Sequence, residues 1–264
     1  MSSQPSSIRL NKFLAERLGV SRREADDLIA SGQITVDDTK AILGTKIDSK
    51  SKICYNHKIV PFENQYLYIA FHKPVGYVCS RRAQGQTPTI YDLLPAKYHH
   101  LKTVGRLDKD SSGLILLTND GDFAFQMTHP KFRKTKLYEV ELDRPLEPLH
   151  QQMISDYGVM LDDGPSQFKV IKHESTSPLS RGFRSAAARG LARSPRGDGR
   201  EQRDPRETVM PVHYEVVLTE GRNRQIRRTF AALGYHVTKL HRTQFGKYEL
   251  RDLEEGKFQI MPTE

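Results

Sequence analysis

The sequence contains no tryptophan, only two cysteines and no apolar run long enough to cross a membrane. Cys54 and Cys79 stand alone, without a C-x-x-C pair or histidines at ligand spacing, so neither a disulfide framework nor a zinc site is predicted. The polar start, Met1 to Pro5, lacks the apolar segment of a signal peptide. These absences predict a cytoplasmic protein without a bound metal, in which both thiols are buried.

The chain has more basic than acidic residues. Lysine and arginine number 41 against 32 aspartates and glutamates, which gives a formal net charge of +9. This excess predicts an anionic partner, with nucleic acid as the first candidate and a merely solvated basic surface as the alternative. The 264 residues suffice for one large domain or two smaller ones.

Residues 8–61 have the pattern of a small separate domain, preceded by a polar tail of residues 1–7 that we expect to be disordered. The first predicted helix ends at Gly19 and has an apolar face made of Leu10, Phe13, Leu14 and Leu18. A second helix begins with Ser21 and Glu24 at the spacing of a capping box. Short alternating runs then predict strands, the first at 34–36 and the others at 53–55 and 58–60.

Basic side chains crowd these two predicted helices. Arg22 and Arg23 would place two cations in the first helical turn, against the helix dipole, which favours an anion-binding role over a solvated turn. The pattern L-x-x-[FL]-L…G-x-S-R-x-x-A-x-x-x-I-x-x-G-x-[IV]-x-V resembles the small RNA-binding domain first known from ribosomal protein S-four. The resemblance implies RNA contacts by Lys12, Arg17, Arg22 and Arg23.

Residues 66–264 alternate between strand and helix patterns and predict a larger domain built on a mixed or antiparallel sheet. Strands are expected at Tyr66–Phe71, Leu114–Thr118, Lys136–Leu142, Phe168–Lys172 and Val212–Thr219. Helices are expected at Asp122–Met127, Glu147–Asp156 and Arg224–Gly234. Within this domain, residues 175–210 are a low-complexity run rich in Arg, Ser, Gly and Pro, predicted to be a disordered insertion. Contact of this insertion with RNA and an inert solvated loop both remain open.

The most informative run is G-R-L-D-K-D-S-S-G at 105–113, followed by the apolar L-I-L-L and by T-N-D-G. It places Asp108 just ahead of a strand that is apolar on both faces, where falling solvation lets neighbours tune the pKa of a carboxyl group. One alternative is a structural ion pair between Arg106 and Asp108. A calcium loop is disfavoured because its twelfth position, Asn119, is not a glutamate. A metal-dependent phosphoesterase would have to use carboxylates without histidine partners, namely Asp108, Asp110, Asp120 and Asp122.

This run resembles the catalytic signature of the RNA pseudouridine synthases, in particular the RsuA/RluB type that modifies ribosomal RNA. The resemblance implies that Asp108 is the catalytic nucleophile, and Arg106 is placed to keep it ionised by pairing with it. The segment H-K-P-V-G-Y at 72–77 is similar to the N-K-P-x-G-Y turn of the family, with His72 where asparagine is usual. Lys73 is then expected to face RNA.

Three further blocks occur in the order of the family. Lys136 and Tyr138 match its K-x-Y motif, in which the tyrosine ring lies against the target base. The run E-G-R-N-R-Q-I-R-R at 220–228 is similar to the segment that lines the active cleft, and K-L-H-R-T-Q-F-G at 239–246 is expected to complete the pocket. The resemblance implies catalysis by Asp108, Tyr138 and Arg228, and support from Arg106, Lys136, Ile226, Leu240 and Arg242. It implies RNA contacts by Lys73, Arg222, Asn223, Arg224, Gln225 and Arg227.

The sequence thus predicts an α+β protein, with a small N-terminal α/β RNA-binding domain and a larger mixed or antiparallel-sheet pseudouridine synthase domain. The expected reaction converts one uridine of ribosomal RNA to pseudouridine, with large-subunit RNA favoured and small-subunit RNA second. No cofactor is predicted, and the partner is ribosomal RNA or an assembling subunit, bound by a monomer. The alternative is a ribosome-associated RNA-binding protein without catalysis.

Overall fold

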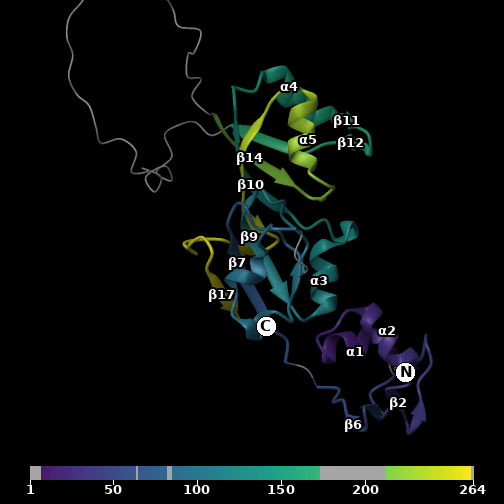
Figure 1. The fold of residues 1–264 in the computed structure, drawn as a ribbon. Helices are drawn as coiled ribbons and strands as arrows, with labels where there is room; N and C mark the ends of the chain where they lie inside the picture. The colour runs from purple at the N-terminus through teal and green to yellow at the C-terminus, as the bar shows by residue number, and fades with distance from the viewer. Residues whose placement is uncertain (1–6, 64, 82–84, 173–211, 263–264) are drawn as a thin grey trace, which may run out of the picture. The chain divides into compact units, whose positions relative to one another are not determined.

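The computed structural model describes residues 7–63, 65–81, 85–172 and 212–262, and the chain divides into two compact units. Unit 1 comprises Met1–Thr135 and Arg242–Glu264, and unit 2 comprises Lys136–His241 (Figure 1). The predicted α+β class is confirmed, since both units combine helices with sheets. The predicted tail and the 175–210 insertion lie outside the described residues, apart from Ser7. Within the described ranges, every helix is too short or too polar to cross a membrane.

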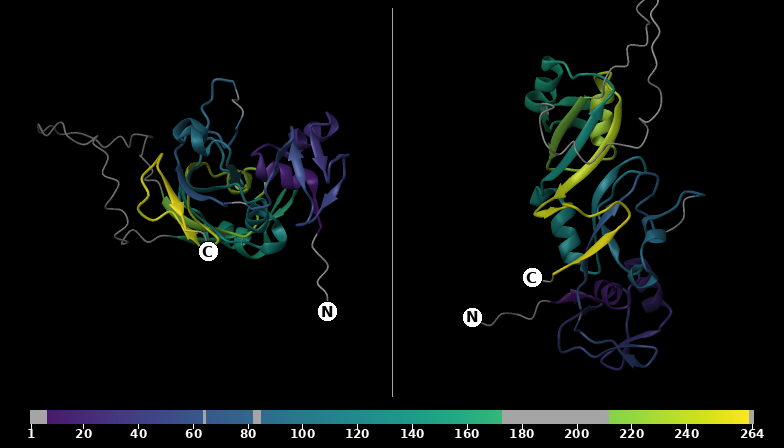
Figure 2. Two further views of the ribbon diagram at one scale, coloured as in Figure 1. Left: turned by 90° about the horizontal axis from the view of Figure 1, so that it is seen from below. Right: turned by 90° about the vertical axis from the view of Figure 1, so that its left-hand side faces the viewer.

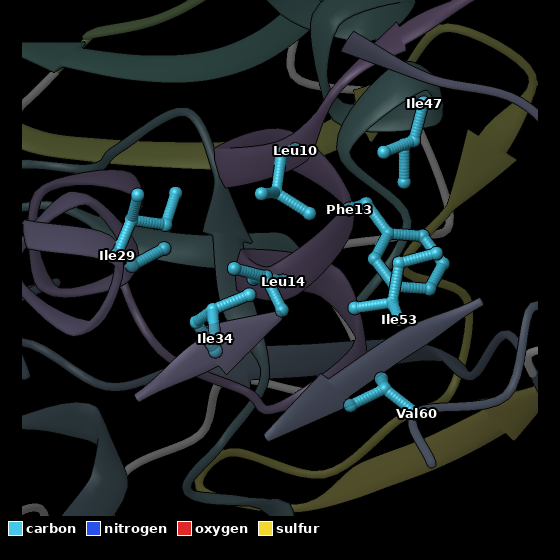
Figure 3. Packing of buried hydrophobic residues seen from close by; sticks show 9 residues of the cluster. Leu10, Phe13, Leu14, Ile29, Ile34, Ile47, Ile53 and Val60 are labelled. Atoms are coloured by element: carbon cyan, nitrogen blue, oxygen red, sulfur yellow. The ribbon is translucent and has the colours of Figure 1, made fainter. Parts of the chain in front are cut away.

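The N-terminal part of unit 1 is a small domain with its own core. Helices α1 (Leu10–Arg17) and α2 (Arg22–Ala30) follow the predicted boundaries. The predicted capping box is present, because Ser21 Oγ accepts a hydrogen bond from Glu24 N at 3.1 Å and the Glu24 carboxylate accepts one from Ser21 N at 2.6 Å. Figure 3 shows the core cluster, which is formed by Leu10, Phe13, Leu14, Ala25, Ile29, Ile34, Ile47, Ile53 and Val60.

Short antiparallel strands complete this domain. Their order in the four-stranded sheet is β3-β2-β5-β6, and a separate pair is formed by β1 and β4. The bounds are β1 Ile8–Arg9, β2 Ile34–Val36, β3 Thr39–Lys40, β4 Lys46–Ile47, β5 Ile53–Tyr55 and β6 Lys58–Ile59. Cys54 is buried here as expected, whereas Cys79 is of intermediate exposure as a residue.

The second part of unit 1 is built around β9 (Ser112–Thr118), all of whose residues are buried. The strand pairs antiparallel with β7 on one side, and β7 pairs in turn with β17. β8 also pairs with β9. The other elements are β7 Tyr68–Lys73, β8 Lys102–Val104, β16 Tyr248–Glu249, β17 Phe258–Met261, α3 Gly121–Thr128, and the 3-10 helices η1 Ile90–Leu93, η2 Ala96–Tyr98 and η3 Pro130–Phe132. Burial on both faces of β9 confirms the sequence pattern.

Gly113 lets another strand pass very close to β9. Strand β15 (Val237–Phe245) enters unit 1 at Arg242. A Cβ atom added to Gly113 would lie 2.2 Å from the Arg242 carbonyl oxygen, and the φ angle of Gly113 is +109°. Any side chain would clash with backbone there and would also strain the left-handed conformation. Glycine is therefore required where the loop that carries Asp108 joins the sheet.

Unit 2 contains an antiparallel sheet in the order β13-β14-β10. Tyr138 of β10 lies opposite Val216 of β14, and α5 packs on this sheet (Figure 2), with Phe230 at a ring-centroid distance of 5.9 Å from Phe168. The helix predicted at 147–156 is instead α4 followed by a single π-helical turn, η4. The bounds are β10 Lys136–Leu142, α4 Pro148–Gln152, η4 Met153–Tyr157, β11 Val159–Leu161, β12 Gly164–Ser166, β13 Lys169–Lys172, β14 Val212–Leu218 and α5 Gln225–Ala232.

Candidate active site

Asp108 lies half-buried in the loop between β8 and β9, and backbone contacts fix this loop. Ser111 N donates to the carbonyl oxygen of Asp108 at 3.1 Å, and Gly76 N donates to that of Lys109 at 2.7 Å. Leu107 is buried, and its N–H donates to the Cys79 sulfur at 3.4 Å. The carboxylate is thus carried by a backbone that is held on both sides of it.

Lys73 is the main anchor of this loop. Its Nζ donates to the backbone oxygens of Ser111 at 2.6 Å, Pro74 at 2.9 Å and Lys109 at 3.4 Å. An ammonium group has three hydrogens to donate, so these three carbonyls can use all of its donors. The side chain, at the end of β7, therefore ties the loop that contains Asp108 to the sheet.

The expectation that Lys73 faces RNA is wrong, because its exposed fraction is 0%. Burial lowers the pKa of the ammonium to about 8, while the neighbouring Cys79, Asp108 and Asp110 act in the opposite direction. The family resemblance identified the position but not its surroundings. The lysine contributes to the site by holding its backbone.

Arg242 and Cys79 lie next to the same loop. Arg242 is buried, and its Nε donates to the Leu114 carbonyl oxygen at 2.7 Å. Burial raises the pKa of the Cys79 thiol, and the cations Lys73, Arg242 and Arg106 act in the opposite direction. Two of these cations, Arg242 and Arg106, are predicted supporting residues of the site. Arg106 is itself exposed, and its pairing with Asp108 stays a prediction.

The other predicted site residues lie in unit 2. Lys136 and Tyr138 are both buried, on one face of β10, as their spacing predicts. Lys136 Nζ donates to the Glu220 carbonyl oxygen at 3.0 Å, which ties β10 to the loop ahead of α5. Ile226 of α5 and Leu240 of β15 are also buried. Their roles against a base stay predictions.

The basic run 220–228 covers the loop ahead of α5 and the first turn of that helix, and contains both exposed and buried residues. Asn223 and Arg224 are exposed, and Arg224 adopts a left-handed conformation at the start of the helix with φ of 45°. Gln225 is only 3% exposed, and its amide donates to Ser166 Oγ at 3.1 Å. Its expected contact with RNA is therefore wrong, because the amide binds the protein. Arg227 donates from Nη1 to the Val237 carbonyl oxygen at 2.7 Å.

Arg222 and Arg228 share the aspartates of the tight turn between β11 and β12. Arg228 Nη2 lies 2.9 Å from Asp163 Oδ1 and also contacts Asp162. Arg222 Nη1 lies 2.9 Å from the same Asp163 oxygen. The hydrogen bond from Arg228 lowers the pKa of Asp163. Two carboxylates thus compensate the charge of Arg228. Arg222 fastens the turn to the loop ahead of α5, and Arg228 fastens it to α5 itself.

The four predicted RNA contacts of the N-terminal domain differ in their surroundings. Arg22 and Arg23 are exposed in the first turn of α2. Lys12 Nζ lies 2.5 Å from the Asp122 carboxylate. Arg17 donates from Nε to the Pro61 carbonyl oxygen at 3.1 Å and lies over the ring of Phe13. Arg22 and Arg23 thus fit an RNA-facing role best.

Two parts of the site were missed in the sequence. The D-D-G turn at 162–164 is a recognisable turn signal, but only the structure brings it to Arg222 and Arg228. The burial of Lys73 could not be predicted, because no pattern in a single sequence distinguishes a buried lysine from an exposed one. Among the described residues, no group of three or more His, Cys, Asp or Glu side chains could hold a metal ion, so the four aspartates of the phosphoesterase alternative do not gather.

Two family profiles match the chain. The profile described as RNA pseudouridylate synthase matches residues 67–232, which is more than half of the chain, and the S4 domain profile matches residues 8–53. The predicted S-four-type domain is therefore confirmed. Both matched ranges include predicted site residues, among them Asp108 in the first range and Arg22 in the second.

Named proteins are similar over most of the chain. "Ribosomal small subunit pseudouridine synthase A" of Pasteurella multocida (strain Pm70) is 33% identical over 263 residues, covering 97% of each protein. "Ribosomal large subunit pseudouridine synthase B" of Yersinia pestis is 30% identical over 249 residues, covering 92% of this chain and 68% of that protein. A solved structure, described as the crystal structure of pseudouridylate synthase, matches with a TM-score of 0.61 at 26% identity and covers 97% of this chain and 96% of that one.

The pKa of Lys73 predicts a pH dependence of stability. Below about pH 8 the lysine is protonated in both the folded and the unfolded state, and the cost of burying its charge is complete. Between about pH 8 and 10.5 the unfolded state binds more protons, so this group makes the free energy of unfolding rise with pH. In urea titrations, wild type should gain stability relative to Lys73→Met across this window. Lys58→Met, at an exposed lysine, is the control, and a constant difference for Lys73→Met would contradict the prediction.

The shared aspartate predicts coupled effects of Arg228 and Asp163. If Arg228 acts by fastening the turn to α5, then Arg228→Gln and Asp163→Asn should lower kcat/KM to values within about twofold of each other, and the double variant should lose little more. Steady-state kinetics on ribosomal RNA would measure the cycle. A loss in Arg228→Gln far beyond that in Asp163→Asn would instead favour direct action of Arg228 on the substrate.

Proposed function

The chain belongs to the RNA pseudouridylate synthase family, and from this premise we propose that it isomerises one uridine of ribosomal RNA with Asp108 as the nucleophile. The reaction breaks the bond between ribose carbon 1′ and uracil nitrogen 1, turns the base and joins carbon 1′ to carbon 5. The proton of carbon 5 is released, and nitrogen 1 gains one. Because atoms and electrons balance within the nucleotide and the solvent, the reaction needs no oxidant and no group donor.

The position of Asp108 is the observation that carries this proposal. A nucleophile must be partly accessible and must be held in one geometry, because misplacement by about 1 Å costs catalysis about 100-fold. Asp108 is half-buried, and the loop around it is fixed by the Lys73 ammonium and by Gly76 N. Attack on the ribose and attack on the uracil ring are both compatible with this position.

Tyr138 is proposed to support the uracil ring. A base must leave its helix before it can turn, and a flat aromatic ring can hold an unstacked base without reading its pairing edge. Tyr138 is buried on β10, beside Lys136, whose ammonium ties that strand to the loop ahead of α5. We propose that Ile226 and Leu240, which belong to the same unit as Tyr138, also line the site of the base. Arg242 is proposed to support the site from unit 1, through its hydrogen bond to the Leu114 carbonyl oxygen.

Basic residues are proposed to bind the RNA backbone. Extruding a base costs a few kcal/mol, which contacts with phosphates can offset. Arg22 and Arg23 are exposed on the N-terminal domain, and Asn223 and Arg224 are exposed ahead of α5. With ribosomal RNA as its substrate, the enzyme would work in the cytoplasm.

The RNA of the large subunit is the proposed substrate, and that of the small subunit is the second candidate. The runs N-R-Q-I-R-R and S-S-G-L-I-L-L-T-N-D-G look nearer to the large-subunit enzymes. The second candidate is favoured by the end-to-end correspondence with the small-subunit enzyme of Pasteurella multocida, which the chain covers to 97%, against 68% of the large-subunit enzyme of Yersinia pestis. A ribosome-associated binding protein without catalysis is the rival outside the enzymes.

Release of tritium from RNA labelled at uracil carbon 5 tests the proposal directly. Wild type should release tritium from one of the two ribosomal RNAs, and Asp108→Asn should reduce the rate by about 10⁴-fold or more, because no other group replaces a lost nucleophile. Asp110→Asn, two residues away in the same loop, is the matched control and should stay active. Release by Asp108→Asn at the wild-type rate would refute the nucleophile, and no release by wild type from either RNA would favour the binding protein.

A further inference from the structure

Two phenylalanine rings are exposed, one in α3 and one in η3. Phe125 is 45% exposed and Phe132 is 38% exposed, although large aromatic side chains are mostly buried in proteins. Their ring centroids lie 5.8 Å apart in an edge-to-face arrangement. The exposed imidazole of His129 has its centroid 4.7 Å from that of Phe125 and 6.4 Å from that of Phe132. Three flat rings thus gather on the surface of unit 1.

A lysine ammonium group lies over the two phenylalanine rings. Lys131 Nζ is 5.2 Å from the ring centroid of Phe125 and 4.7 Å from that of Phe132. Arg133 and Lys134 follow directly, and the sequence has no acidic residue between Asp122 and Glu139. Aromatic faces next to cations complement the bases and phosphates of single-stranded nucleic acid. We call Phe125, His129, Lys131 and Phe132 together the aromatic platform.

The platform is held by a tight turn. Phe132 N donates to the His129 carbonyl oxygen at 3.1 Å, and Arg133 N donates to the Pro130 carbonyl oxygen at 3.0 Å. Lys131 N donates to His129 Nδ1 at 3.2 Å, which fixes the imidazole. Because the rings are already ordered, a ligand that stacks on them loses little affinity to the ordering of side chains.

The platform begins next to the loop that carries Asp108. A Cβ atom added to Gly105 would lie 3.5 Å from Thr128 Cγ2. Gly105 is three residues ahead of Asp108, and Thr128 directly precedes His129. Gly105, Asp108 and Thr128 all lie within unit 1. A nucleotide held on the rings would therefore lie beside the segment that leads to the proposed nucleophile.

We propose that the aromatic platform stacks unpaired nucleotides that flank the target uridine. This inference rests on the proposed RNA substrate and specifies the form of RNA that is bound, a single strand or a loop. Extrusion of the uridine leaves its neighbours without a stacking partner, and aromatic rings accept the face of any base. The Lys131 ammonium and Arg133 would neutralise the phosphates of the same nucleotides. Duplex RNA keeps its base faces covered and gains only the charge contacts.

Binding of a short fluorescein-labelled oligouridylate, compared with an RNA duplex of equal length, tests the platform. The double variant with Phe125→Ala and Phe132→Ala should bind the oligouridylate about tenfold more weakly and leave duplex affinity unchanged, because only single strands stack. Phe125→Tyr with Phe132→Tyr keeps both rings and should bind like wild type. Tyr66→Ala, at a ring that is also 38% exposed, is the control and should have no effect.

The salt dependence of binding tests Lys131 separately. Lys131→Gln should reduce the slope of log Kd against log salt for the oligouridylate by about 0.7, the value for one phosphate contact on a single strand. Unchanged oligouridylate affinity in the double alanine variant would overturn the proposal, and so would an equal loss on the duplex. Since binding is measured without chemistry, platform-dependent binding by a protein that releases no tritium would count against the proposed catalysis and not against the platform.

Discussion

The fixed backbone around Asp108 depends above all on one buried ammonium group. Lys73 donates to the carbonyl oxygens of Pro74, Lys109 and Ser111, and thereby ties the loop to the end of β7. Burying this charge is costly, as the lowered pKa of Lys73 indicates, and the cost is offset because all three of its hydrogens can be donated to carbonyls. Gly113 completes the arrangement, since the Arg242 backbone occupies the space that a side chain would need.

The same principle operates in unit 2 with the charges reversed. There Asp163 is the shared acceptor, and Arg222 and Arg228 are the donors that fasten the β11–β12 turn to the loop ahead of α5 and to α5 itself. In both units a charged side chain orders a loop that carries residues expected to meet RNA. An enzyme that must extrude a base benefits from loops that are ordered before the substrate arrives. Such loops lose no conformational entropy on binding, so the affinity for the substrate is not lowered by ordering them.

Much of the fold could be predicted because it depends on local patterns. The boundaries of β10 and the capping box of α2 follow from alternation and from the spacing of Ser21 and Glu24. The motifs also singled out Asp108 and Tyr138, whose catalytic roles stay predictions. Lys73 and Gln225 were misjudged for one physical reason: a polar residue in a motif can contact either the ligand or the backbone that supports the ligand site. Only tertiary structure distinguishes the two, and the same holds for the partners of Arg228.

Mapping pseudouridine in cellular ribosomal RNA tests the central claim most directly. Carbodiimide treatment followed by primer extension would be compared between a deletion strain complemented with wild type and one complemented with Asp108→Asn. The account predicts one stop, at a single uridine, that returns with wild type and stays absent with Asp108→Asn. A stop restored by both proteins would contradict the role of Asp108, and the same pattern of stops with and without the wild-type gene would contradict the proposed activity on ribosomal RNA.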